Sequence, residues 1–127
     1  MTHSFSILPQ NFAIARLEPD ADLPSAVWAS PGFTAITRTD DELSIVCAED
    51  VAGGLARVDR AWRAIKEQGP FAFDQTGVLA SFLEPLAVAA IGIFAVSTYD
   101  TDYILVKSAN LEAAVAALKG AGHRLLV

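Results

Sequence analysis

The sequence predicts an α+β fold made of two ferredoxin-like βαββαβ repeats, each an antiparallel sheet with its helices on one face. Three observations predict it. One β-hairpin pattern occurs twice, an amphipathic helix precedes its second copy, and a further helix and a short strand follow that copy. The chain has 127 residues, of which 53% are hydrophobic and 19% charged, so it has enough apolar material for a core.

The repeated hairpin appears when the chain is laid over itself with an offset of 60 residues. Residues 36–46 then lie over residues 96–106. Each segment is an apolar, β-rich run followed by a short acidic turn and a second apolar run, which is the pattern of a hairpin. A short strand is expected ahead of each hairpin, at residues 11–14 and 70–73.

The second repeat carries the clearer helices. Apolar residues recur at helical spacing over residues 76–91, with Asp74 or Thr76 as the cap and Pro85 as a source of bending. Asn110 is expected to cap a helix over residues 111–119, which Gly120 or Gly122 ends. Residues 123–127 are then expected to form the last strand.

The first repeat is degenerate. Three prolines and three acidic residues in residues 17–31 leave room for one or two helical turns around residues 25–28, and Gly53 and Gly54 weaken a helix at residues 50–55. Residues 59–67 fit either an amphipathic helix or a strand, and the repeat pattern favours a closing strand at residues 61–66. We therefore expect a degenerate repeat over residues 1–60 and a well-formed one over residues 61–127.

Composition excludes several classes of partner. The net charge is −6 and the nine basic residues are scattered, so a phosphate backbone is repelled and nucleic acid is not an expected partner. Acidic residues and Pro85 interrupt the apolar stretch over residues 77–106, which therefore predicts a core and no membrane span. The start of the chain has no pattern of a secretory signal, so a cytoplasmic location is expected.

No catalytic constellation is present in the sequence. His3 and His123 are not adjacent to a nucleophile, the single Cys47 lies in an apolar run that predicts an inert buried thiol, and no glycine-rich phosphate loop occurs. The Asp100–Asp102 segment begins like a calcium loop but lacks its glycine and terminal glutamate. We expect no enzyme activity, no metal and no cofactor.

The segment Gly-Pro-Phe-Ala-Phe-Asp-Gln-Thr-Gly-Val-Leu at residues 69–79, together with Ser-Thr-Tyr-Asp-Thr-Asp-Tyr-Ile-Leu-Val at residues 97–106, resembles an ACT domain. The pattern is similar to the tandem ACT repeats of bacterial ACT-domain proteins and of the cellular arginine sensors, and to the regulatory part of aspartate kinase. This resemblance implies a non-catalytic regulatory module that binds a free amino acid where ACT domains meet. Because this chain has one well-formed copy, it also implies a homodimer.

Carried over residue by residue, the resemblance implies a ligand site made by two segments, whose members are Gln75, Thr76, Gly77, Val78, Thr98, Tyr99 and Asp102. The chemistry of these residues fits an amino acid. Free amides at a helix start attract the ligand carboxylate, glycine allows close approach, and Asp102 accepts from an ammonium group or a basic side chain.

Simpler interpretations of the same residues remain open. Acidic residues in a hairpin turn often bond their own backbone, Thr76 is equally suited to capping the helix, and Tyr99 to a surface position. In the offset of 60 the first repeat has Arg38 for Thr98 and Glu42 for Asp102, so an equivalent site there is not expected. The alternative function is a ligand-free structural or protein-interaction dimer that regulates a partner protein.

Overall fold

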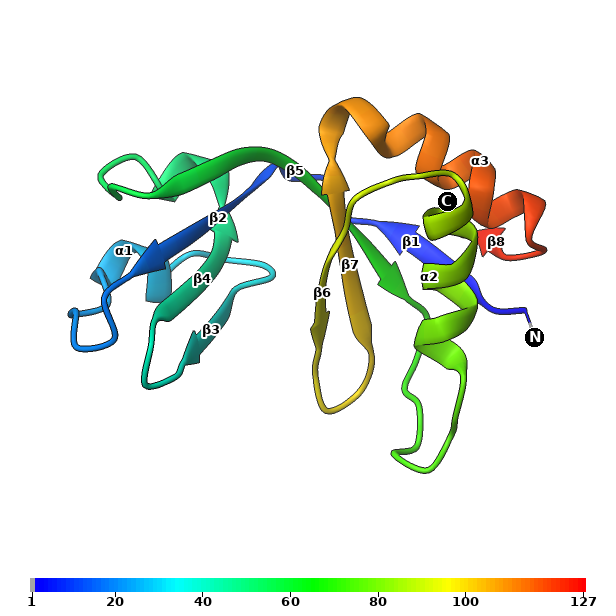
Figure 1. Ribbon diagram of the computed structural model, residues 1–127, viewed down its shortest axis with the longest axis horizontal. Coiled ribbons are helices and arrows are strands. Elements are labelled where there is room, and N and C mark those ends of the chain that lie inside the picture. The colour runs from blue at the N-terminus through cyan, green and yellow to red at the C-terminus, as the bar shows by residue number, and fades with distance from the viewer. Residues whose placement is uncertain (1) are drawn as a thin grey trace. The chain divides into compact units, whose positions relative to one another are not determined.

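The computed structural model describes residues 2–127. Eight strands and three α-helices follow one another along the chain (Figure 1). In chain order these are β1 (Ser4–Ile7), β2 (Phe12–Leu17), α1 (Ser25–Trp28), β3 (Ala35–Arg38), β4 (Leu43–Ala48), β5 (Val58–Glu67), α2 (Val78–Val88), β6 (Phe94–Ser97), β7 (Asp102–Lys107), α3 (Leu111–Gly120) and β8 (Arg124–Leu125). None of the helices in residues 2–127 has the length and apolar character needed to cross a membrane.

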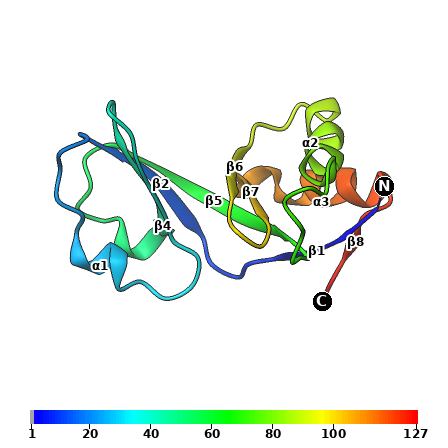
Figure 2. The same ribbon diagram turned by 90° about the horizontal axis from the view of Figure 1, so that it is seen from below.

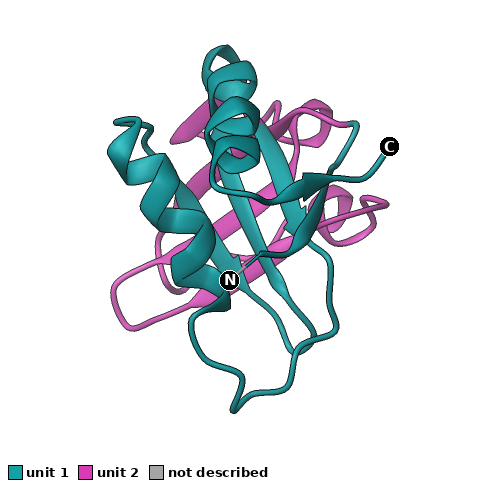
Figure 3. Cartoon of the chain, turned by 90° about the vertical axis from the view of Figure 1, so that its right-hand side faces the viewer, with its two compact units in different colours: residues 1–9, 63–127 teal, residues 10–62 magenta. Residues whose placement is uncertain are grey.

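The contacts divide the chain into two compact units (Figure 3). One unit is Gln10–Trp62, and the other joins Met1–Pro9 to Arg63–Val127. Strand β5 runs through the division, so its first half belongs to one unit and its second half to the other. The division therefore adds a segment from the start of the chain to the unit that holds the second hairpin. The repeat boundary expected after residue 60 stays a prediction.

The unit Gln10–Trp62 holds a sheet in the order β3-β4-β2-β5. Its single α-helix is the four-residue α1, which confirms the prediction of one or two turns. The pairing of β2 with β5 passes from Phe12–Trp62 to Ile14–Asp59, so β5 has one residue more than β2 in that interval. This is a β-bulge, and Ala61 takes a positive φ of 65° within it.

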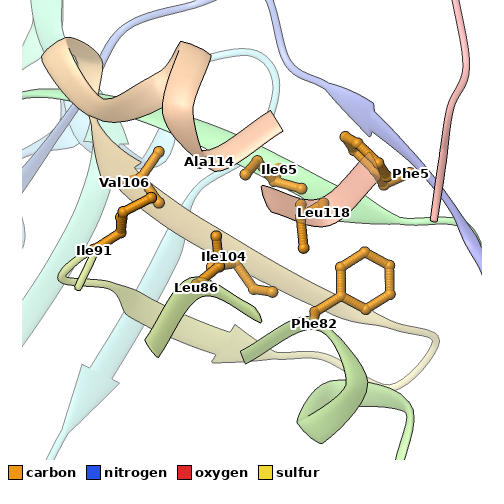
Figure 4. Packing of buried hydrophobic residues seen from close by; sticks show 9 residues of the cluster. All are labelled: Phe5, Ile65, Phe82, Leu86, Ile91, Ile104, Val106, Ala114 and Leu118. Atoms are coloured by element: carbon orange, nitrogen blue, oxygen red, sulfur yellow. The ribbon is translucent and has the colours of Figure 1, made fainter. Parts of the chain in front are cut away.

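The second unit has strands in the order β6-β7-β5-β1-β8, and both longer helices lie on the same side of the sheet (Figure 2). Their apolar faces and the sheet enclose a core whose members come from β1, β5, β7, the two helices and Ile91 in the segment after α2 (Figure 4). Strand β1 pairs antiparallel with β5, with Phe5 opposite Glu67. The expected closing strand at residues 123–127 exists only as β8, which pairs with β1 and not with β5.

Residues 70–73 do not form the predicted strand. They belong to a loop after β5, and the strand that precedes the second hairpin is β5 itself, which confirms the strand interpretation of residues 61–66. Pro70 has no N–H for a ladder, and the Phe71 N–H donates to the Asp100 carbonyl at 2.8 Å. The apolar run Phe71-Ala72-Phe73 thus resembled a strand only in composition.

Both predicted hairpins are confirmed, but their equivalent positions are 59 residues apart and not 60. Arg38 pairs with Leu43 in the first hairpin as Ser97 pairs with Asp102 in the second. In each turn a threonine, Thr39 or Thr98, donates from its amide and hydroxyl to the carbonyl three residues on. The position equivalent to Asp102 is therefore the buried Leu43 and not Glu42, and Thr39, not Arg38, corresponds to Thr98.

Helix α2 starts without the predicted side-chain cap. Its N-cap is Gly77, whose φ of 80° is left-handed, and neither Asp74 nor Thr76 makes a capping bond. Asn110 occupies the N-cap position of α3 as predicted, but its side chain makes no capping bond, because the 3-10 turn Ser108–Asn110 leads directly into the helix. Gly122, with a φ of 97°, follows α3 in the left-handed conformation that the sequence predicts.

Pro85 lies inside α2 and leaves the Ser81 carbonyl without its helical donor. The ring of His123 takes that place, with Nε2 at 2.8 Å from the Ser81 oxygen. Its Nδ1 accepts the backbone N–H of His3 at 3.1 Å, so the ring hydrogen is on Nε2. His123 is therefore a buried structural residue that joins the start of the chain to α2.

The placement of β1 can be tested through Phe5, which is fully buried and contacts the ring of Phe82 edge-on. We expect Phe5→Ala to lower the free energy of unfolding by about 3–5 kcal/mol, since a buried aromatic leaves a cavity. Urea unfolding followed by circular dichroism measures the change. Val88→Ala, at a side chain 85% exposed, is the control. Equal small effects for both variants would contradict the docking of β1.

Candidate functional site

A pocket of about 340 Å³ lies between the loop that leads into α2 and the tip of hairpin β6–β7. Six of the seven residues implied by the resemblance line it, and they come from both segments: Gln75, Gly77, Val78, Thr98, Tyr99 and Asp102. Thr76 is exposed and is not among the lining residues. The structure therefore brings the two predicted segments together, although 19 residues of chain separate Val78 from Thr98.

Three contacts hold the loop against the hairpin tip. The Phe71 N–H donates to the Asp100 carbonyl at 2.8 Å, and the rings of Phe73 and Tyr99 meet edge-on with centroids 4.8 Å apart. Gly69 completes the join, because a Cβ there would lie 2.8 Å from the Asp100 carbonyl oxygen. The pocket is thus a consequence of a close backbone approach that only glycine allows.

The hairpin turn uses the hydroxyl of Thr98 for itself. Its Oγ1 donates to the Thr101 carbonyl at 3.1 Å and accepts the Thr101 N–H at 3.3 Å. Thr98 therefore shapes the wall of the pocket through its turn. Tyr99, 79% exposed, lies on the rim together with Phe73, which the sequence analysis did not include.

The start of α2 forms the opposite wall through Gly77, Val78, Leu79 and Ala80. The first amides of a helix have no intrahelical partner, and the helix dipole places partial positive charge on them. Gly77 has no side chain to cover these amides, and no capping side chain competes for them. This wall is suited to an anionic group.

Asp102 supplies a negative group to the same pocket. It is the first residue of β7 and lies on the same face of the strand as the buried Ile104, because side chains alternate along a strand. The Ser97 hydroxyl, directly across the hairpin, donates to Asp102 Oδ1 at 2.5 Å. The carboxylate is thus half-buried, oriented, and free of the turn bonds that acidic hairpin residues often make.

Glu67 is the residue that sequence reasoning missed. It is fully buried at the end of β5, and neither of its carboxyl oxygens has a hydrogen-bond partner among the described residues. Burial raises the pKa of the Glu67 carboxyl to about 8, and the neighbouring Asp102 carboxylate adds to that effect. Glu67 is therefore a neutral acid at neutral pH.

Strand periodicity offered a signal for Glu67. Ile65 is buried in the core, and Glu67, two residues further along the same strand, shares its face. An acid on the core face at the end of a strand is unusual. The signal is weak in the sequence because residues 59–67 fit a helix as well as a strand, and only in a strand does Glu67 share the face of Ile65.

Other places in the molecule offer less chemistry. A larger hollow, of about 720 Å³, lies between α2 and α3, but its walls are mostly small and apolar and it holds one of the predicted residues, Gly77. Within residues 2–127 no three His, Cys, Asp or Glu side chains are grouped as a metal site requires. Cys47 is fully buried on β4, where burial raises the pKa of its thiol, as the inert-thiol interpretation predicts.

The buried acid predicts a particular dependence of stability on pH. An unfolded Glu ionises near pH 4.5, whereas folded Glu67 keeps its proton until about pH 8. Between these values the folded state binds more protons, so the contribution of Glu67 to the free energy of unfolding falls as pH rises, by up to about 1.4 kcal/mol per unit. Glu67→Gln has no carboxyl group that titrates at this position. We therefore expect its free energy of unfolding to exceed that of the wild type by an amount that grows from pH 5 to pH 8.

Urea unfolding at pH 5, 6, 7 and 8 measures this difference. Glu84→Gln is the matched control, because it is the same substitution at an exposed position of α2. A constant difference between wild type and Glu67→Gln over this range would show that Glu67 does not hold a proton in the folded protein.

Comparison with known proteins gives the family. The model of the ACT domain matches residues 57–120, and a model of a separate N-terminal domain family matches residues 10–53. A crystal structure of a protein from Agrobacterium tumefaciens has a TM-score of 0.92 and 47% identity, over 99% of this chain and 93% of that one.

More distant structures share the fold. A Vibrio cholerae protein of unknown function, described as a possible transport protein, has a TM-score of 0.73 and 19% identity over 93% of this chain and 88% of that one. The regulatory subunit of aspartate kinase from Thermus flavus has a TM-score of 0.64 and 11% identity over 94% and 97%. The ACT-type ferredoxin-like fold that the sequence predicts is therefore confirmed, and the chain belongs to the ACT domain family.

Proposed function

We propose that this protein is a non-catalytic regulatory module that binds a free amino acid in the pocket between residues 71–80 and hairpin β6–β7. The observation that carries the proposal is that one pocket contains both a partly positive group and a negative group, which we call its two poles. The uncovered amides at the start of α2 form one wall, and the Asp102 carboxylate belongs to the other. A free amino acid has a carboxylate and an ammonium a few ångströms apart, so it complements both poles at once.

The energetics of each pole support this assignment. An anion at a helix N-terminus gains about 0.3–1 kcal/mol, rising to about 2 kcal/mol where the site is partly buried. A charge-assisted bond from an ammonium to Asp102 is stronger than a bond between neutral groups, and the Ser97 hydroxyl already holds the carboxylate in position. The pocket volume of about 340 Å³ falls at the small end of the range for ligand pockets, which suits a small polar ligand.

We further propose that the functional form is a homodimer in which a second copy covers the pocket rim. Phe73 and Tyr99 are 77% and 79% exposed, and they stand in contact at the mouth of the pocket. Exposed aromatic residues are enriched in the cores of protein interfaces. A partner over this rim would exclude water from the ligand and strengthen both charged contacts.

A thermal-unfolding screen with each proteinogenic amino acid at millimolar concentration tests ligand binding. At a hundredfold excess over Kd a ligand adds about 2.7 kcal/mol to the free energy of unfolding, so the midpoint should rise by several degrees. Asp102→Asn should remove the shift. Asp41→Asn, in the turn of the other hairpin and exposed, should retain it. If no amino acid moves the midpoint, the ligand-free interaction dimer replaces this proposal.

The dimer is tested by sedimentation or light scattering. We expect a mass of twice the 13.4 kDa chain for the wild type, and a shift toward monomer when Phe73 and Tyr99 are both replaced by Ser. Both side chains are largely exposed, so the double variant should fold as the wild type does. A monomeric wild type that binds its amino acid with full affinity would contradict the dimer and leave the ligand site intact.

A further inference from the structure

We propose that Glu67 is a second acidic residue of the pocket, which acts behind Asp102 and releases its proton when the cationic group of a ligand binds there. This inference rests on the proposed function and adds a residue, a ligand charge and a proton to it. The cationic group of the ligand is an ammonium or a guanidinium group. Glu67 is a positioning residue, because it acts on the ligand through Asp102.

The geometry that supports this inference comes from the pairing of β5 with β7. Glu67 follows Ile65 on the core face of β5, and Asp102 precedes Ile104 on the core face of β7. The buried hydroxyl of Thr101 donates to the Glu67 carbonyl at 2.8 Å, which fixes the end of β5 beside the start of β7. Two carboxyl groups are thereby held next to each other, and of the two it is Asp102 that lines the pocket.

No other charged side chain offsets this pair. Neither Glu67 nor Asp102 has an ion pair with a lysine or arginine of the described residues. Around Glu67, β1 contributes Phe5, and α2 contributes Phe82 to the same core. Asp100 lines the pocket together with Asp102, and the rings of His3 and His123 stack with Phe82.

Among the described residues, neither histidine ring forms an ion pair with Glu67 or Asp102. Burial lowers the pKa of the His3 ring, and His123 and the chain terminus lower it further. His123 accepts a hydrogen bond at Nδ1, which a doubly protonated ring cannot do. The pair of carboxyl groups thus shares one negative charge and one proton, and a second negative charge needs a cation from outside.

A bound cation changes this balance. Its positive charge beside Asp102 stabilises the ionised form of Glu67, so the Glu67 carboxylic acid becomes a carboxylate and its proton passes to the buffer. The free protein holds the proton up to about pH 8, and the complex releases it at a lower pH. Binding therefore releases a proton at pH values between the pKa of Glu67 in the complex and its pKa in the free protein. In this range the affinity for the ligand rises with pH, until about pH 8.

Isothermal titration calorimetry tests this linkage. The probe is the amino acid with the largest midpoint shift in the screen above, titrated at pH 6, 7 and 8 in phosphate and in Tris, whose ionisation enthalpies differ. We expect affinity to rise on the order of tenfold from pH 6 to pH 8, with a fraction of a proton released at pH 7. The N-acetyl form of the probe, which lacks the α-ammonium, shows whether the α-ammonium or a basic side chain is the cation.

Glu67→Gln is the decisive variant, because glutamine keeps the shape and neutrality of the protonated acid but has no proton to lose. We expect it to bind with an affinity independent of pH and with equal heats in the two buffers, whereas Glu84→Gln retains the wild-type behaviour. A wild type with pH-independent affinity, or proton release that survives in Glu67→Gln, overturns the inference while the amino-acid site stands. A screen without any shift overturns the proposed function, and this inference with it.

Discussion

The pairing of β5 with β7 at the end that carries Thr101 is the constraint on which the pocket depends. The buried Thr101 hydroxyl bonds the Glu67 carbonyl, and the following residue, Asp102, then begins β7 on the core face. The same approach brings the Asp100 carbonyl against Gly69 and the Phe71 amide. One strand end therefore places the hairpin tip, the loop before α2 and both carboxyl groups.

The two hairpins show how one local pattern leads to two chemical outcomes. Both turns are organised by a threonine that bonds the residue three positions on, and both hairpins have the same pairing. The position that is Asp102 in one is Leu43 in the other, and Leu43 is fully inside the core of its unit. An acid at that position is stable only where a pocket or another polar group receives it, as in the second hairpin.

The start of the chain has a structural role that its composition conceals. Phe5 lies in the core of the second unit. The His3 amide donates to the ring of His123, and this ring replaces the helical donor that is missing at Pro85. A helix with an internal proline is destabilised by its unpaired carbonyl. Here a histidine from beyond α3 satisfies that carbonyl, so α2 keeps its position beneath the pocket.

The sequence by itself determined the elements whose signals are local. Period-two runs around an acidic turn determined both hairpins, helical spacing determined α2 and α3, and the motifs at residues 69–79 and 97–106 indicated the family and six lining residues of the pocket. Only the tertiary structure decided which strand closes the second unit, that residues 70–73 are a loop, and that Glu67 lies against Asp102. These depend on pairings between residues 29 to 62 positions apart, such as Phe71 with Asp100 and Phe5 with Glu67, and such pairings leave no periodic pattern in either segment.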